Sequence, residues 1–289
     1  MKSLFEGVGV ALVTPFLNNH IDYISTRRLI EKHIKEGCSA IVALATTGEA
    51  PSITDDERVS FIKFCNSVIK HRVKLIVGTG NNNFEKCFSL TKQAKELGAD
   101  GALIVTPYYN KTTQRGLVEF YKTLSVLQFP IIIYNVPART GLSIELDTIK
   151  TLIKTNPYIY GIKESTCDIN RIVKLHQICK NKIAVYSGED ELNFLFYCLG
   201  GNGTISVTAN AFCKDVCDVF NLSKSEKTKL ALEKQTSLSK VNNLMFCETN
   251  PIPIKHLLKN LRIIESDEVR LPLVELSFKN RIKIDRIKR

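Results

Sequence analysis

The feature that most constrains the fold is a regular recurrence of short, apolar, β-rich runs. Each run ends on small or polar residues, and helical patterns fill the intervals of about 20 to 35 residues between them. The eight runs cover residues 7–14, 40–45, 75–78, 101–106, 131–135, 158–163, 183–187 and 203–208. Strands that alternate with helices in this way predict a parallel sheet.

The helical patterns carry their own start and stop signals. They cover residues 23–36, 54–71, 84–97 and 116–127. Thr54 is followed three residues later by Glu57, which is the pattern of a capping box. Gly37 and Gly98 stand just past two of the patterns, where a glycine ends a helix.

The length of 289 residues fits one (β/α)8 TIM barrel with an appendage. After about residue 222 the strand signal stops, and helices are expected over 223–243 and 254–261, separated by Asn-Pro-Ile-Pro from Asn250. We therefore expect a barrel catalytic domain over 1–222 and a C-terminal helical extension over 223–289. An open doubly wound sheet is the alternative, but no GxGxxG follows a first strand, and GVGV lies inside one.

The formal charge of +11 does not predict a nucleic-acid partner. The basic residues are scattered, only the tail from Lys279 is dense in them, and no nucleic-acid motif accompanies them. The N-terminal apolar run is interrupted by Glu6 and lacks a cleavage site, and no run approaches 18 apolar residues. We expect a cytoplasmic protein without a membrane segment.

Nine cysteines form an odd set without a metal-ligand spacing. Cys213 and Cys217 are the closest pair, and no His is near them in the sequence, so a zinc site is not expected. Reduced, mostly buried thiols are the default for a cytosolic chain.

Lys163 is the residue whose placement most suggests chemistry. It interrupts a β-rich run, YIYGIKEST from Tyr158, that reads as a buried strand ending at a polar mouth. An amine carried into an enclosed site loses solvation of its ammonium form and becomes nucleophilic, as Schiff-base catalysis requires. The alternative is that Lys163 only pairs with Glu164 at a solvated strand end.

Other polar side chains follow the remaining runs, and the carboxyl ends of barrel strands meet at one mouth. They include Thr46, Thr47, Tyr108, Tyr109, Tyr134, Arg139 and the Ser-Gly-Glu-Asp at 187–190. Neither His nor a carboxylate cluster suited to a divalent metal accompanies them. This set of side chains favours imine chemistry on a small oxo-acid, and we expect no metal ion at the site. Each member also has a structural explanation: a cap for the threonines, packing for the tyrosines, a surface loop for Arg139.

Collinear motifs in this chain resemble the dihydrodipicolinate synthase and N-acetylneuraminate lyase family of pyruvate-dependent aldolases. They are VTPF at 13–16, TTGE at 46–49, GTGN at 78–81, VTPYYN at 105–110, YNVPARTG at 134–141, GIKES at 161–165, SGED at 187–190, GNGTISVTAN at 201–210 and NPIP at 250–253. Their order and spacing span nearly the whole chain, which makes coincidence implausible.

The resemblance implies that Lys163 forms an imine with pyruvate, without a cofactor. It implies that Thr46, Tyr134 and Tyr109 relay protons, with Tyr109 supplied by a neighbouring subunit of a homotetramer built from tight dimers. Thr47, together with Thr46, would hold the pyruvate carboxylate. Backbone groups near Gly188 and Ile205 would shape the pocket.

Arg139 resembles the family's synthases, where this position receives the carboxylate of L-aspartate 4-semialdehyde. The resemblance then implies a lyase of lysine and diaminopimelate biosynthesis that makes 4-hydroxy-tetrahydrodipicolinate. Cleavage of N-acetylneuraminate or another 2-oxo-3-deoxy acid is the alternative enzyme, and a non-catalytic basic binding barrel is the alternative of another class.

The family's feedback site for L-lysine is altered in this sequence. Asp55, Arg58 and Lys86 occupy positions where the family often has His and Glu, while Asn82 and Tyr108 fit. A lysine at 86 repels an α-amino group, so we expect weak or absent inhibition by L-lysine.

Overall fold

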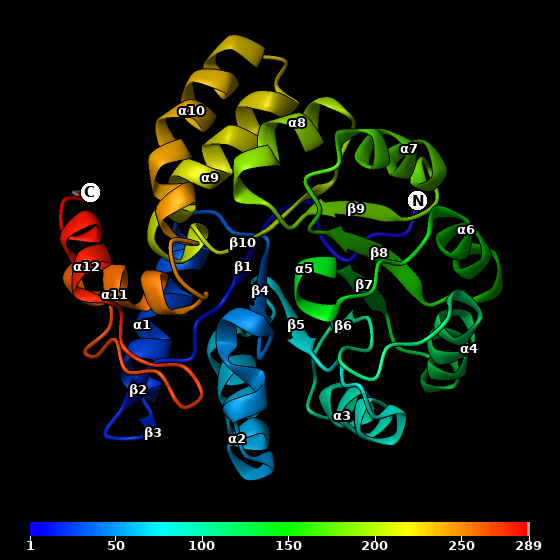
Figure 1. The fold of residues 1–289 in the computed structure, drawn as a ribbon, viewed down its shortest axis with the longest axis horizontal. Coiled ribbons are helices and arrows are strands. Elements are labelled where there is room, and N and C mark those ends of the chain that lie inside the picture. The colour runs from blue at the N-terminus through cyan, green and yellow to red at the C-terminus, as the bar shows by residue number, and fades with distance from the viewer. Residues whose placement is uncertain (288–289) are drawn as a thin grey trace.

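The computed structural model describes residues 1–287, and within them eight parallel strands close into a barrel. The strands are β1 (Gly7–Ala11), β4 (Ala40–Ala43), β5 (Lys74–Gly78), β6 (Gly101–Val105), β7 (Ile131–Asn135), β8 (Ile159–Glu164), β9 (Ala184–Ser187) and β10 (Gly203–Ser206). Strand β10 pairs with β1 and completes the circle. Figure 1 shows the helices arranged around these strands. The TIM barrel is confirmed, and the doubly wound sheet is excluded.

The helices of the barrel are α1 (Tyr23–Lys35), α2 (Asp55–Ile69), α3 (Phe84–Glu96), α4 (Gln114–Leu124), α5 (Pro137–Thr140), α6 (Leu146–Thr155), α7 (Ile169–Cys179), α8 (Asn193–Cys198) and α9 (Ala209–Lys224). The four helices for which the sequence predicts bounds, α1 to α4, begin and end within three residues of those bounds. The capping box is confirmed, because Glu57 N donates to Thr54 Oγ1 at 3.3 Å and Thr54 N donates to Glu57 Oε2 at 3.0 Å. Gly37 and Gly98 follow helix ends with φ of +94° and +83°, as a C-terminal cap requires.

Several strands end two or three residues earlier than their apolar runs. Strand β1 ends at Ala11, β4 at Ala43 and β10 at Ser206. The remaining residues of each run leave the sheet and enter the loops of the mouth. A short hairpin of β2 (Phe16–Leu17) and β3 (His20–Ile21), turned at Asn18 and Asn19, was not expected. Both asparagines have positive φ, which suits a tight hairpin turn.

The interior of the barrel holds its own apolar cluster, separate from the larger one between strands and helices. Phe5 stacks on Tyr186 with ring centroids 4.4 Å apart, and Tyr186 Oη donates to the Phe5 carbonyl at 2.8 Å. Ile205, Leu103 and Ile132 lie in the same cluster. The barrel is therefore a packed core beneath its mouth, not a pore.

Of the C-terminal helices, α10 (Thr228–Leu244) and α11 (Ile252–Asn260) pack against α9, and α12 (Phe278–Ile284) packs against α11 (Figure 1). The helix expected over 223–243 begins later, at Thr228, since α9 continues to Lys224 and a turn with Glu226 at φ +59° follows. Helix α12 was not expected. Within the described residues, no helix is long and apolar enough to cross a bilayer.

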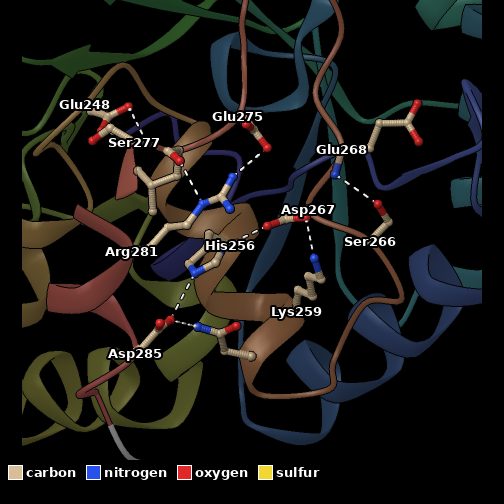
Figure 2. Close-up of polar contacts among 12 residues, drawn as sticks. Glu248, His256, Lys259, Ser266, Asp267, Glu268, Glu275, Ser277, Arg281 and Asp285 are labelled. Atoms are coloured by element: carbon tan, nitrogen blue, oxygen red, sulfur yellow. Dashed lines mark hydrogen bonds and ion pairs between the residues drawn. The ribbon is translucent and has the colours of Figure 1, made fainter. Parts of the chain in front are cut away.

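Polar contacts fasten α12 to α11 (Figure 2). His256 on α11 lies between Asp267, 2.7 Å from its Nδ1, and Asp285, 3.0 Å from its Nε2. The hydrogen bond with Asp267 raises the pKa of His256. Arg281 in the basic tail pairs with Glu275 at 2.6 Å. The last two residues of that tail and of the expected extension, 288 and 289, lie outside the described residues.

Candidate active site

Lys163 lies on β8 near the carboxyl end of the barrel and is only 6% exposed. Its strand neighbours are Tyr134 on β7 and Tyr186 on β9, each paired with it in register. The Lys163 Nζ lies 4.3 Å from the centroid of the Tyr134 ring. A buried amine on an aromatic face contradicts the alternative of a solvated lysine at a strand end.

The segment after β9 packs directly against Lys163. A Cβ atom built on Gly188 would lie 2.9 Å from Lys163 Cε, so only a glycine leaves room for the lysine stem here. Glu189 is the nearby carboxyl group: burial raises its pKa, and the charge of Lys163 acts in the opposite direction. Ile205 on β10 is buried in the inner cluster that also contains Tyr134.

A cavity of about 370 Å³ opens at the mouth. Its lining brings Thr46, Tyr134 and Arg139 together with Tyr108 and with Pro272 of the C-terminal segment. Lys163 is not among the described lining residues, and it reaches the cavity wall through the Tyr134 ring. This volume and its few polar groups suit a small polar molecule.

The two threonines of the TTGE motif begin a 3-10 turn after β4. Thr46 lines the cavity, whereas Thr47 is buried and accepts a hydrogen bond from Asn250 Nδ2 at 2.9 Å. Because Thr47 Oγ1 is the acceptor, its own hydroxyl proton remains available for donation. Asn250 was expected only as a helix breaker; the structure makes it a support of this turn.

Arg139 and Tyr109 differ in their relation to the cavity. Arg139 lies on the short helix α5, exposed to solvent and lining the cavity edge. Tyr109 is 90% exposed with φ of +68°, and it is absent from the described lining. One chain alone therefore does not bring Tyr109 to the other candidates.

A buried ion pair beneath the TTGE turn was missed from the sequence. Glu49 Oε1 accepts from Lys255 Nζ at 2.5 Å, and both side chains are almost fully buried. Glu49 Oε2 accepts from Arg270 N at 3.0 Å, so the extension is joined to the mouth loop. Burial lowers the pKa of Lys255 to about 8, although Glu49 opposes this. A lysine within the apolar helix pattern IPIKHLL was the available signal.

Two of the altered feedback positions, Lys86 and Asp55, contact each other. Lys86 Nζ pairs with both carboxylate oxygens of Asp55, at 2.8 and 2.7 Å. Arg58 is buried and donates to the Gly78 carbonyl at 2.6 Å. The cations at 58 and 86 therefore already have partners within the chain.

Comparison with known proteins agrees with this geometry. The sequence model of the Dihydrodipicolinate synthetase family matches residues 4–288. The chain belongs to the dihydrodipicolinate synthetase family. Among its relatives in this family is the 4-hydroxy-tetrahydrodipicolinate synthase of Clostridium tetani, 43% identical over 279 residues, which are 96% of this chain and 95% of the relative.

Solved structures of the family have the same fold. A dihydrodipicolinate synthase from Acinetobacter baumannii, complexed with pyruvate, is 40% identical with a TM-score of 0.94 and covers 98% of this chain and 97% of its own. A monomeric dihydrodipicolinate synthase variant is 37% identical with a TM-score of 0.95, covering 97% and 95%. Both likenesses extend over the barrel and the C-terminal helices.

Proposed function

We propose that the chain is a 4-hydroxy-tetrahydrodipicolinate synthase, a lyase that condenses pyruvate with L-aspartate 4-semialdehyde in lysine and diaminopimelate biosynthesis. The observation that carries the proposal is the buried Lys163, set on the ring of Tyr134 beside a cavity that Thr46 and Arg139 also line. Full-length similarity to synthases supports the choice of reaction.

In this proposal the neutral amine of Lys163 attacks the keto carbon of pyruvate. Water leaves and an imine forms, with the phenol of Tyr134 and the hydroxyl of Thr46 moving the protons. Loss of a methyl proton gives an enamine, whose carbon attacks the aldehyde of the second substrate. The amino group of that substrate then displaces Lys163 as the ring closes, which frees the enzyme.

The remaining candidate residues bind the substrates or shape the pocket. Thr47, held by Asn250, donates to the pyruvate carboxylate together with Thr46. Arg139 at the cavity edge pairs with the carboxylate of the aldehyde substrate. Gly188 keeps the space beside the stem of Lys163 open, and Ile205 closes the pocket from below.

The test is reductive trapping followed by two assays. Borohydride with pyruvate should add one pyruvate-derived group on Lys163, located by peptide mass spectrometry. Lys163→Ala should lose it, whereas Lys174→Ala, an exposed change on α7, should keep it. The enzyme should then turn over aspartate semialdehyde and not N-acetylneuraminate. No adduct would refute the imine mechanism, and an adduct with neuraminate cleavage would refute the substrate.

Arg139 gives a separate prediction about the second substrate. Arg139→Ala should lower kcat/KM for aspartate semialdehyde by roughly 10- to 100-fold, the range for a lost hydrogen bond to a charged group. Borohydride trapping with pyruvate should be unchanged, and Arg139→Lys should recover part of the loss. Unchanged kcat/KM in Arg139→Ala would remove this residue from the site.

We also propose a cytoplasmic homotetramer, a dimer of dimers, with weak or absent inhibition by L-lysine. Nine free cysteines suit a reducing compartment. The Lys86–Asp55 pair places an ammonium where an acidic side chain would bind an α-amino group. Inhibition by L-lysine in the usual feedback range, abolished by Asn82→Ala, would contradict this expectation.

A further inference from the structure

Four side chains capable of binding a metal lie close together where α1 meets α9, away from the mouth. His33, Glu36 and Cys213 each offer one ligand atom, and these atoms lie within 4.8 Å of one another. Cys217, one turn along α9, has its Sγ 4.0 Å from Cys213 Sγ. No local pattern could predict this cluster, because His33 and Cys213 are 180 residues apart.

The imidazole of His33 needs a partner. The residue is fully buried, and within residues 1–287 neither Nδ1 nor Nε2 makes a hydrogen bond of ordinary geometry, although the Cys213 thiol lies close to the ring. A buried polar group left in this way costs about 1–3 kcal/mol, a cost that coordination to a metal ion would remove.

The spacing of the two thiols on α9 suits a shared metal ion. A tetrahedral zinc ion with Zn–S bonds of about 2.3 Å separates two sulfurs by about 3.8 Å. The 4.0 Å between Cys213 and Cys217 is close to that separation.

We propose that His33, Glu36 and Cys213 form a structural site for a borderline divalent metal ion, Zn²⁺ or its substitute Co²⁺, and that the thiol of Cys217, one turn further along α9, completes the ligand set when the ion binds. Two thiolates, one imidazole and one carboxylate select such an ion over Mg²⁺ or Ca²⁺, which prefer oxygen ligands alone. Binding releases the two thiol protons to solvent, and no oxidant or reductant is needed.

The charge of the site is balanced within the chain. Two thiolates and one carboxylate carry three negative charges, which the divalent ion and one ammonium neutralise. Lys32 provides that ammonium, since its Nζ donates to Glu36 Oε2 at 2.7 Å. Glu36 also caps the carboxyl end of α1, where the helix dipole favours a cation.

The position of the site indicates a role in stability. His33 and Glu36 lie at the end of α1 that leads into β4, so they belong to the end of the barrel opposite the mouth. Cys213 and Cys217 lie on α9, the helix that follows the closing strand β10. The ion would therefore join the first and last helices of the barrel across its closure.

The test measures metal content in the full chain, expressed with supplementary zinc and purified under reducing conditions without chelator or histidine tag. Wild type should hold about one zinc ion per chain. Cys213→Ala should bind zinc more than roughly 100-fold more weakly, as loss of a direct ligand requires. Cys65→Ala is the matched control, a buried cysteine on α2 outside the cluster, and should keep the metal.

Two further measurements separate a built site from other outcomes. Co²⁺ added to the wild-type apoprotein should give thiolate charge-transfer absorption, lost in Cys213→Ala and kept in Cys65→Ala. A chelator should lower the wild-type Tm. Zinc far below one per chain, equal binding by Cys213→Ala, or cobalt spectra without thiolate absorption would overturn the proposal. The wild-type measurements stand even where a variant fails to fold.

Discussion

At the scale of single residues, the candidate site depends on how closely its neighbours pack around Lys163. Lys163 and Tyr134 could be named from the sequence because each ends a β-rich run, and the barrel fixes where such ends meet. The buried ion pair of Glu49 and Lys255, which supports the TTGE turn, could not be predicted from the sequence. The two residues are 206 positions apart, and only the fold brings them together. The exposure of the two tyrosines could not be predicted either. Nothing in the local sequence VTPYYN indicates that Tyr108 lines the cavity and that Tyr109 does not.

Gly188→Ala tests this packing. The new Cβ would lie 1.9 Å from Ser165 Oγ, 2.9 Å from Lys163 Cε and 3.0 Å from the Glu164 carbonyl, so the lysine stem must move. A displacement of about 1 Å at a reacting group can cost roughly 100-fold in rate, and we expect kcat/KM to fall by that order. Borohydride trapping of pyruvate and steady-state kinetics measure the effect.

The double variant Gly188→Ala, Ser165→Ala provides the control. It removes the hydroxyl nearest the new methyl group but leaves the contact with Lys163 Cε. Stability should therefore recover more than activity does. Full activity in Gly188→Ala alone would show that Lys163 has more freedom than its burial indicates.

At the scale of elements, the periodic patterns located every barrel strand and left the ends uncertain. The apolar runs continue past β1, β4 and β10 because the mouth loops are themselves buried, and hydrophobicity does not record where the ladder hydrogen bonds stop. The predicted start of α10 was wrong for a related reason. The helices α9 and α10 follow each other closely, and only the short turn at 225–227 separates them.

The join between α11 and the TTGE turn gives a prediction about stability. Lys255→Met should destabilise the chain by roughly 3–5 kcal/mol, since Glu49 would be left buried without its cation. The double variant Glu49→Gln, Lys255→Met should recover much of that loss. Denaturant midpoints of the four members of the cycle measure the coupling.

An exposed ion pair serves as the comparison for this cycle. Lys214 pairs with Asp218 at 3.0 Å on the surface of α9, and Lys214→Met should leave the midpoint unchanged within error. If Lys255→Met were as mild as Lys214→Met, the buried pair would not be what holds the mouth loop to the extension.

At the scale of the whole molecule, Tyr109 is the candidate that neither lines the described cavity nor packs inside the chain. That side chain is 90% exposed at a residue with φ of +68°, on the loop that also places Tyr108 in the cavity wall. A large phenol held outward is explained if it enters the site of a neighbouring subunit, as the proposed tight dimer requires. The sequence could suggest a shared site only through the family resemblance, since no local sequence pattern predicts how subunits associate.

Subunit complementation tests the role of Tyr109. Tyr109→Phe and Lys163→Ala should each be nearly inactive, yet refolding them together at equal concentrations should restore about a quarter of wild-type activity. Half of randomly formed dimers are then mixed, and each mixed dimer has one site with both Lys163 and the partner's phenol. If Tyr109 acted within its own chain, no mixed dimer would contain an intact site. Activity that stays at the level of the separate variants, with mixed dimers shown by native mass spectrometry, would contradict the shared site.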